Sequence, residues 1–282
     1  MNSEANFKET SDSREAPLGR LSRGGMREDV WAPLRKLTSA RIALGRAGGS
    51  MPTRHQLDFQ LAHACARDAV WSRFDPDALA ADMRKLGPEV ITVESAARDR
   101  AEFLQRPDLG RRLATESRVR LLQQFGQSAG VDLAIIVTDG LSALAVTTQS
   151  PPFLAELLHL LQHDSWSIAP LIVARHGRVA LQDEIGEICR AKISLILIGE
   201  RPGLGSPDSM GLYFIYSPKT GKTDADRNCV SNIRQGGLPP VEAAQKVRHL
   251  LYACRKMAIS GVQLKDDSAA AISDLGDLLP LD

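Results

Sequence analysis

Residues 193–205, with the sequence ISLILIGERPGLG, constrain the fold of this chain more than any other stretch. They begin with a run of β-branched and long aliphatic residues that is too short for a helix. Such a run is typical of a strand buried on both faces, as in a parallel sheet. The run ends at Gly199, and Glu200 and Arg201 follow on a loop rich in Gly and Pro. Because ligands of open α/β sheets bind beyond the carboxyl ends of strands, this charged pair indicates either a binding edge or an exposed ion pair at an ordinary strand exit.

The same design recurs through the second half of the chain, where short apolar runs alternate with helical segments. The runs predict strands at 131–137, 168–173, 193–198 and 212–216, and the segments between and after them predict helices at 151–163, 183–189 and 240–258. This alternation favours an α/β fold with a mostly parallel sheet and helices on its faces.

The first half of the chain is mainly helical. Thr53 is a good N-cap for a helix at 54–73, and Asp75 followed by Pro76 starts a second helix. The predicted organisation has four parts, which are a disordered or targeting tail at 1–28, a mainly helical region at 29–127, the α/β domain at 128–265 and a C-terminal tail at 266–282.

Composition excludes several classes of protein. The chain has 282 residues, of which 43% are hydrophobic and 24% are charged, as in an ordinary globular protein. Its net charge of +1 gives no electrostatic reason to expect nucleic acid or an anionic membrane as a partner. No apolar run approaches the roughly 18–20 residues that span a bilayer. The four cysteines form no CxxC pair, so we expect neither a zinc ribbon nor a disulfide scaffold, and the cytoplasm is the expected location.

Most candidate site motifs fail on spacing. Gly221-Lys222-Thr223 resembles the end of a phosphate-binding loop, but Tyr216 stands where that motif needs its first glycine. The glycines at 199, 203 and 205 do not have dinucleotide-binding spacing. Cys229 lies in a polar, turn-rich stretch without an identifiable base, so it is either a small buried thiol or a ligand contact. The sequence therefore predicts a binding-type domain with no catalytic residues and no metal ligands of its own.

Several long segments resemble the small (light) chain of ethanolamine ammonia-lyase. They are SARIALGRAGGSMPTRHQLDFQLAHACARDAV, RPDLGRRL, VTDGLSALAV, ISLILIGERPGLG and YSPKTGKTDADRNCVSNIRQGGLPPVEAA, and they occur in the family's order from about residue 37 to about residue 265. The first 30 or so and last 15 or so residues fall outside the resemblance.

The resemblance implies an adenosylcobalamin-dependent lyase that converts ethanolamine to acetaldehyde and ammonia. In that family the large chain holds ethanolamine, and the small chain is a Rossmann-like domain that covers the other side of the corrin. The implied assembly is a hetero-oligomer with several copies of each chain. The implied location is the cytoplasm, within a bacterial microcompartment.

The resemblance also assigns three cofactor-binding residues. The valine of a short strand after the R-x-G-R turn matches Val179, the glutamate of G-E-R-P-G-L-G matches Glu200, and the cysteine of D-R-x-C-x-S-N matches Cys229. No D-x-H-x-x-G motif is present, so no side chain of this chain need ligate cobalt. Two other interpretations remain open, a free-standing α/β enzyme or binding protein for a nucleotide-like ligand and a purely structural protein of a shell.

Overall fold

The computed structural model describes residues 26–27, 29–162 and 164–266. The predicted tails at 1–28 and 266–282 lie outside this range, apart from Met26, Arg27 and Asp266. The chain divides into two compact units, Met1–His63 and Ala64–Asp282.

The first unit contains few regular elements. Strands β1 (Met26–Arg27) and β2 (Arg46–Ala47) pair in antiparallel fashion, and a single 3-10 turn, Ala32–Lys36, lies between them. Helix α1 (Thr53–Trp71) begins in this unit and ends in the second. The predicted helix at 54–73 is confirmed within two residues at each end.

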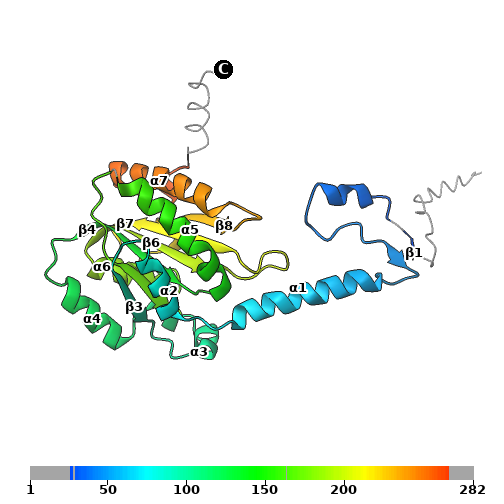
Figure 1. Cartoon of the computed structure of the whole chain (residues 1–282), viewed down its shortest axis with the longest axis horizontal. Coiled ribbons are helices and arrows are strands. Elements are labelled where there is room, and N and C mark those ends of the chain that lie inside the picture. Colours follow the sequence, from blue (N-terminus) through cyan, green and yellow to red (C-terminus); the bar gives the residue numbers. More distant parts are fainter. Residues whose placement is uncertain (1–25, 28, 163, 267–282) are drawn as a thin grey trace, which may run out of the picture. The chain divides into compact units, whose positions relative to one another are not determined.

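A six-stranded sheet forms the centre of the second unit (Figure 1), with the order β3-β5-β4-β6-β7-β8. The strands are β3 (Val90–Glu94), β4 (Val131–Thr138), β5 (Leu171–Arg175), β6 (Ala191–Gly199), β7 (Met210–Tyr216) and β8 (Asn228–Ile233). The first four strands in this order are parallel, and β7 and β8 are antiparallel to their neighbours. The α/β class with a mostly parallel sheet is therefore confirmed, whereas the finer Rossmann-like description stays a prediction.

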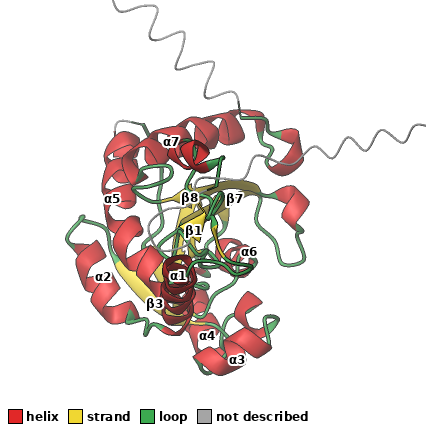
Figure 2. Ribbon diagram, turned by 90° about the vertical axis from the view of Figure 1, so that its right-hand side faces the viewer, coloured by secondary structure: helices red, strands yellow, loops and turns green. Residues whose placement is uncertain are grey.

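Helices cover both faces of this sheet, as predicted (Figure 2). One face packs against α2 (Pro76–Arg84), α5 (Ala143–Gln162) and α7 (Pro240–Met257), and the other against α4 (Thr115–Phe125) and α6 (Leu181–Ile188). A short helix, α3 (Arg100–Gln105), follows β3. Strand β6 is buried on both sides because it lies between these two layers, which accounts for its unbroken apolar run.

The order of the strands creates a switch point between β4 and β6. From β4 the chain crosses through α5 to β5 on one side, and from β6 it continues to β7 on the other side. Loops that leave neighbouring strands in opposite directions open a crevice at the carboxyl edge, where open α/β sheets bind their ligands. The exits of β4 and β6 are therefore the place to look for a site.

The division of the chain differs from the predicted boundary between residues 127 and 128. Strand β3, which the apolar run at 90–93 predicts, lies within the mainly helical region and pairs with β5 over its full length. Helix α2 packs on the same core as α5. Residues 64–127 thus belong to the same compact unit as the sheet. The boundary between the two compact units lies after His63 instead.

Three local predictions are wrong. Helix α5 begins at Ala143 rather than at the prolines, because the Ser142 hydroxyl accepts a hydrogen bond from the Ala145 amide (3.2 Å) and apolar residues on both sides of Pro151 and Pro152 are buried. That burial outweighs the cost of about 3 kcal/mol for a proline inside a helix. Val179 lies in a turn before α6 rather than in a strand, and the polar stretch around Cys229 is the edge strand β8.

Candidate functional site

A hollow of about 410 Å³ lies at the switch point between β4 and β6. Its walls come from the exits of both strands, from the turn before α6 and from β7. The lining residues are Gly140, Leu141, Arg178, Val179, Ile198, Gly199, Glu200, Arg201 and Tyr213. Two of the three predicted cofactor contacts, Val179 and Glu200, are therefore brought together from segments about twenty residues apart.

The floor of the hollow depends on a close approach of the two strand exits. The Leu141 amide donates to the Gly199 carbonyl (2.8 Å), and Gly140 has a φ of 51°, in the left-handed region that glycine tolerates best. A side chain at Gly140 would overlap the backbone of Gly199 and the Ile198 side chain. The two glycines thus let the loops touch and leave the space above them open.

Replacing Gly199 with alanine is expected to lower the free energy of unfolding by about 1–3 kcal/mol, the usual cost of overpacking. The new Cβ would overlap the backbone oxygens of Ser142 and Asp139, which cannot move without shifting the start of α5. Urea unfolding measures the effect. The matched control is Gly205→Ala, because a Cβ there meets no atom within 4 Å. Equal stabilities of the two variants would contradict the close approach of the exits.

Glu200 is fixed by contacts with β7 and β8 rather than by the arginine beside it. Its Oε2 accepts from the Ser209 hydroxyl (2.5 Å) and from the Asn232 amide (3.3 Å), and its amide donates to the Ser209 carbonyl (3.0 Å). Within the described chain, Glu200 and Arg201 form no ion pair with each other. The loop therefore does not contain the exposed ion pair that was the alternative to a binding edge. Oε1 has no hydrogen-bond partner among the described residues and is available to a ligand.

Cys229 lies next to this hollow but does not line it. It stands opposite Tyr213 in the β7–β8 pairing, and the tyrosine is a lining residue. Partial burial and the nearby charge of Glu200 raise the pKa of the Cys229 thiol, while a hydrogen bond with Tyr213 lowers it. The cysteine is nevertheless exposed at its surface. All three predicted residues therefore belong to one neighbourhood, with Tyr213 between Glu200 and Cys229.

The sequence analysis missed a buried network beneath the hollow. The Asp139 carboxylate accepts from the His176 amide (2.6 Å), lies 3.2 Å from the His176 ring Nδ1 and pairs with Arg100 (3.0 Å). Arg100 also donates to the carbonyl of Gly140 (2.6 Å), a lining residue. The network holds the β4 exit in place. An aspartate two residues after a buried apolar run was the available signal, although nothing in the sequence indicated which residues would contact it.

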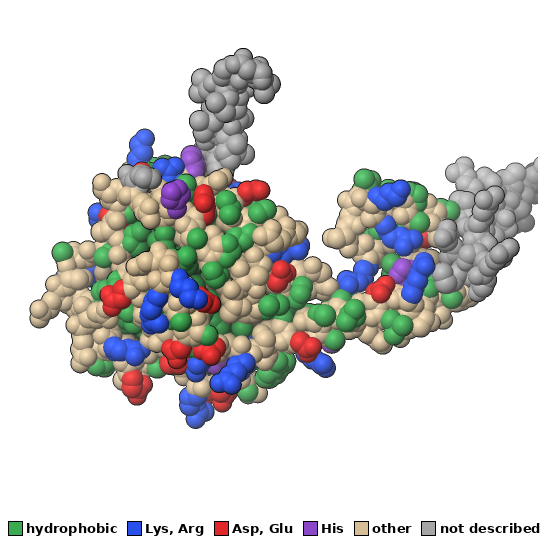
Figure 3. Space-filling view, in the orientation of Figure 1, with side chains coloured by type: hydrophobic (Ala, Val, Ile, Leu, Met, Phe, Trp, Pro, Cys, Tyr) green, Lys and Arg blue, Asp and Glu red, His purple; other side chains and the backbone are tan. Residues whose placement is uncertain are grey.

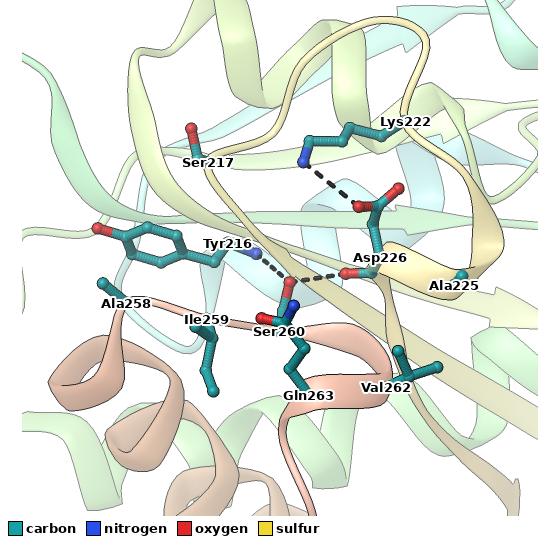
Figure 4. A pocket seen from close by; sticks show the side chains of 10 residues that line it. All are labelled: Tyr216, Ser217, Lys222, Ala225, Asp226, Ala258, Ile259, Ser260, Val262 and Gln263. Carbon is teal, nitrogen blue, oxygen red and sulfur yellow. Dashed lines mark hydrogen bonds and ion pairs between the residues drawn. The ribbon is translucent and has the colours of Figure 1, made fainter.

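A second hollow, of about 360 Å³, lies far from these residues along β6 (Figure 4). It lies where β7 ends, and Tyr216 pairs with Ile193 at the opposite end of β6 from Glu200. The Ser260 hydroxyl accepts from the Tyr216 amide (2.9 Å) and donates to the Asp226 carbonyl (2.6 Å), as the sticks in Figure 4 show. These polar groups form hydrogen bonds with one another, and the bonds join the segment after α7 to the loop after β7.

The surface and the side chains limit the chemistry available. On the face shown in Figure 3, basic and acidic side chains of the second unit are interspersed rather than gathered by sign. In residues 26–27, 29–162 and 164–266, no group of three or more His, Cys, Asp or Glu side chains could hold a metal ion. No helix of the described chain is long and apolar enough to cross a membrane.

Comparison with known proteins identifies relatives along almost the whole described chain. The family model described as "Ethanolamine ammonia-lyase light chain (EutC)" matches residues 28–265. A protein of Pseudomonas aeruginosa named ethanolamine ammonia-lyase small subunit is 53% identical over 249 residues, which cover 88% of this chain and 91% of the relative. Proteins of the same name from Azotobacter vinelandii and Xanthomonas campestris are each 52% identical, over 88% and 85% of this chain and 92% and 89% of their own lengths.

Proposed function

Because this chain belongs to the family of ethanolamine ammonia-lyase light chains, we propose that it covers adenosylcobalamin against a large subunit that holds ethanolamine. The assembled enzyme converts ethanolamine to acetaldehyde and ammonia, and it is a hetero-oligomer with several copies of each chain. When bound, the cofactor supplies the radical chemistry. This chain contributes a surface that binds and orients the cofactor.

The hollow at the switch point fits a corrin. A corrin is a broad ring with an apolar face and amide side chains at its rim, so it needs an apolar floor with hydrogen-bond acceptors beside it. Gly140, Leu141 and Ile198 give such a floor, and Glu200, whose Oε1 has no hydrogen-bond partner among the described residues, lines the same hollow. The proposal depends most on this one observation, that Glu200 and Val179 line a single hollow at the switch point with Cys229 beside it.

Each predicted residue has a distinct role in this proposal. The Glu200 carboxylate accepts a hydrogen bond from a corrin amide or from a ribose hydroxyl. Val179 gives apolar contact from the turn before α6, and the small side chain of Cys229 lets the ligand approach the edge of the sheet closely. Tyr213, which lies between Glu200 and Cys229, widens the contact surface.

Glu200→Gln is expected to weaken binding of adenosylcobalamin about tenfold, or roughly 1.4 kcal/mol. Glutamine keeps an oxygen for Ser209 and Asn232 but places an NH₂ group where Oε1 would accept from the ligand. The measurement is titration of the complex of both chains with adenosylcobalamin, followed by its visible spectrum.

Glu242→Gln is the matched control for this titration, because Glu242 is an exposed glutamate in the first turn of α7 and does not line the hollow. Its affinity should equal that of the wild type. If Glu200→Gln also binds adenosylcobalamin with unchanged affinity, Glu200 does not contact the cofactor.

A free-standing enzyme for a nucleotide-like ligand is the alternative function. It lacks support from a phosphate-binding or dinucleotide-binding motif, and the family match favours a subunit of a lyase. The location in the cytoplasm within a bacterial microcompartment stays a prediction. Fractionation of cells grown on ethanolamine, with detection of this chain in purified shells, would test it.

A further inference from the structure

A basic hollow of about 430 Å³ lies directly beside the site, and it shares Arg178 and Val179 with it. It extends from the turn before α6 to the loop at 222–227. Its lining residues are Pro107, Arg111, Arg178, Val179, Ala180, Lys222, Thr223, Asp224 and Arg227. Four cations therefore face it with a single carboxylate, although the whole chain has a net charge of only +1.

Arg178 is held in place by Phe103 rather than by an ion pair with any described residue. Its guanidinium stacks on the Phe103 ring, 4.2 Å from the ring centre, and Nη2 donates to the Phe103 carbonyl (3.3 Å). Its Nε is buried and has no hydrogen-bond partner among the described residues. Burial, together with the charges of Arg100 and Arg111, lowers the pKa of Arg178, and the charge of Asp139 opposes this shift only in part.

Ion pairs neutralise only part of this excess, since Arg227 also pairs with buried Asp183. The one lining carboxylate, Asp224, is already paired with Arg227 (2.9 Å), and Lys222 pairs with Asp226 (3.4 Å). In the part of the chain that the structure describes, neither Arg111 nor Arg178 forms an ion pair. Two guanidinium groups, one exposed and one half-buried, are thus left facing the same space.

We propose that this basic hollow is an anion subsite for a phosphate group, and that the group is the phosphodiester of the cofactor's nucleotide loop. The inference rests on the proposed function, since it places this phosphodiester beside the corrin contacts of Val179 and Glu200. Guanidinium groups suit phosphate because their N–H donors match its oxygens in pairs. A free phosphate ion has the same chemistry and is distinguished by the experiment.

The experiment measures the affinity of the complex of both chains for adenosylcobalamin and for adenosylcobinamide, which lacks the nucleotide loop and its phosphodiester. Unbound corrinoid is measured by absorbance after ultrafiltration. Arg111→Gln is the main variant, because Arg111 is exposed and its loss should not disturb folding. Arg178→Met is the second variant, and its thermal stability is checked because the side chain packs on Phe103. Arg112→Gln is the matched control, because Arg112 is the adjacent exposed arginine, contacts Asp108 (3.7 Å) and does not line the hollow.

The expected result is that Arg111→Gln binds adenosylcobalamin about tenfold more weakly, the loss of one charge-assisted hydrogen bond, and binds adenosylcobinamide like the wild type. Arg112→Gln should bind both as the wild type does. If instead inorganic phosphate raises the melting temperature of the wild-type complex but not of Arg111→Gln, and adenosylcobalamin affinities are equal, the subsite binds free phosphate.

The anion subsite would be overturned if Arg111→Gln lost affinity equally for both corrinoids. It would also be overturned if Arg111→Gln lost no affinity and phosphate did not change the melting temperature of the wild-type complex. If the wild-type complex binds both corrinoids while the variants show either of these patterns, the proposed function still stands. A wild-type complex that binds neither corrinoid overturns the proposed function as well.

Discussion

Purified alone, this chain is expected to release no acetaldehyde from ethanolamine, with or without adenosylcobalamin. The described residues hold no group of side chains able to bind a metal, and the switch-point hollow contains no nucleophile paired with a base. Oε1 of Glu200, which has no hydrogen-bond partner among the described residues, is suited to accepting a hydrogen bond from a ligand. In the proposed function this chain supplies binding, and the reaction needs the subunit that holds the substrate.

Co-expression with a large chain from the same genome should restore acetaldehyde release, and only when adenosylcobalamin is added. An assay coupled to alcohol dehydrogenase follows the product. The control is the large chain alone, which should give little or no turnover under the same conditions. Deamination of ethanolamine by the isolated small chain would contradict the assignment of a covering role.

Arg227→Met is expected to lower the free energy of unfolding by about 3–5 kcal/mol, the usual cost of leaving a buried charge without its partner. The Arg227 side chain is only 2% exposed and pairs with Asp183, whose side chain is 3% exposed. Arg227 also donates to the carbonyl of Lys222 (3.2 Å), so it fastens the loop after β7 to the start of α6. Urea unfolding of the variant measures the loss.

The loss of stability in Arg227→Met should be larger at high pH than at low pH. Burial raises the pKa of Asp183 to about 6, from an ordinary value of 3.8, so the folded state binds this proton more tightly than the unfolded state does. The contribution of Asp183 to stability thus falls as pH rises from about 4 to about 6. Removing the Arg227 charge should raise that pKa further, so the variant should lose more stability at about pH 8 than at about pH 5.

A double variant tests whether the loss comes from the unpaired charge. Asp183→Leu combined with Arg227→Met replaces the pair with apolar groups, and it should recover most of the stability lost in Arg227→Met. Additive losses in the double variant would show instead that Arg227 acts through its packing and its backbone contacts.

Elements whose burial was visible as a pattern were predictable from sequence. Strand β6 and helix α7 were each predicted within two residues at either end, because an unbroken apolar run and a Pro-initiated amphipathic stretch leave few alternatives. Strand β8 was not predicted, because an edge strand pairs on one side only and keeps polar, exposed residues. The early start of α5 was hidden by Pro151 and Pro152, whose local preference is overridden by the packing of the whole helix.

The site was predictable only in part, for a related reason. Glu200 stands directly after a buried strand, so the rule for carboxyl ends of strands pointed to it. Tyr213 and Arg178 carry no such local signal, since they reach the hollow through the antiparallel pairing of β7 and the turn before α6. Pairings between distant segments set these contacts, and the spacing of residues along the chain does not encode them.

Alkylation of Cys229 in the assembled complex tests the central claim most directly, because this thiol is proposed to lie against the bound cofactor. Cys65 is also exposed and serves as the internal control, while Cys189 and Cys254 are buried. Iodoacetamide labelling is done at about pH 9, because burial raises the pKa of the Cys229 thiol above the ordinary value of about 8.5, and peptide mass spectrometry follows it. The account predicts that adenosylcobalamin slows labelling of Cys229 several-fold and leaves Cys65 unchanged. Equal labelling rates of Cys229 with and without the cofactor would contradict it.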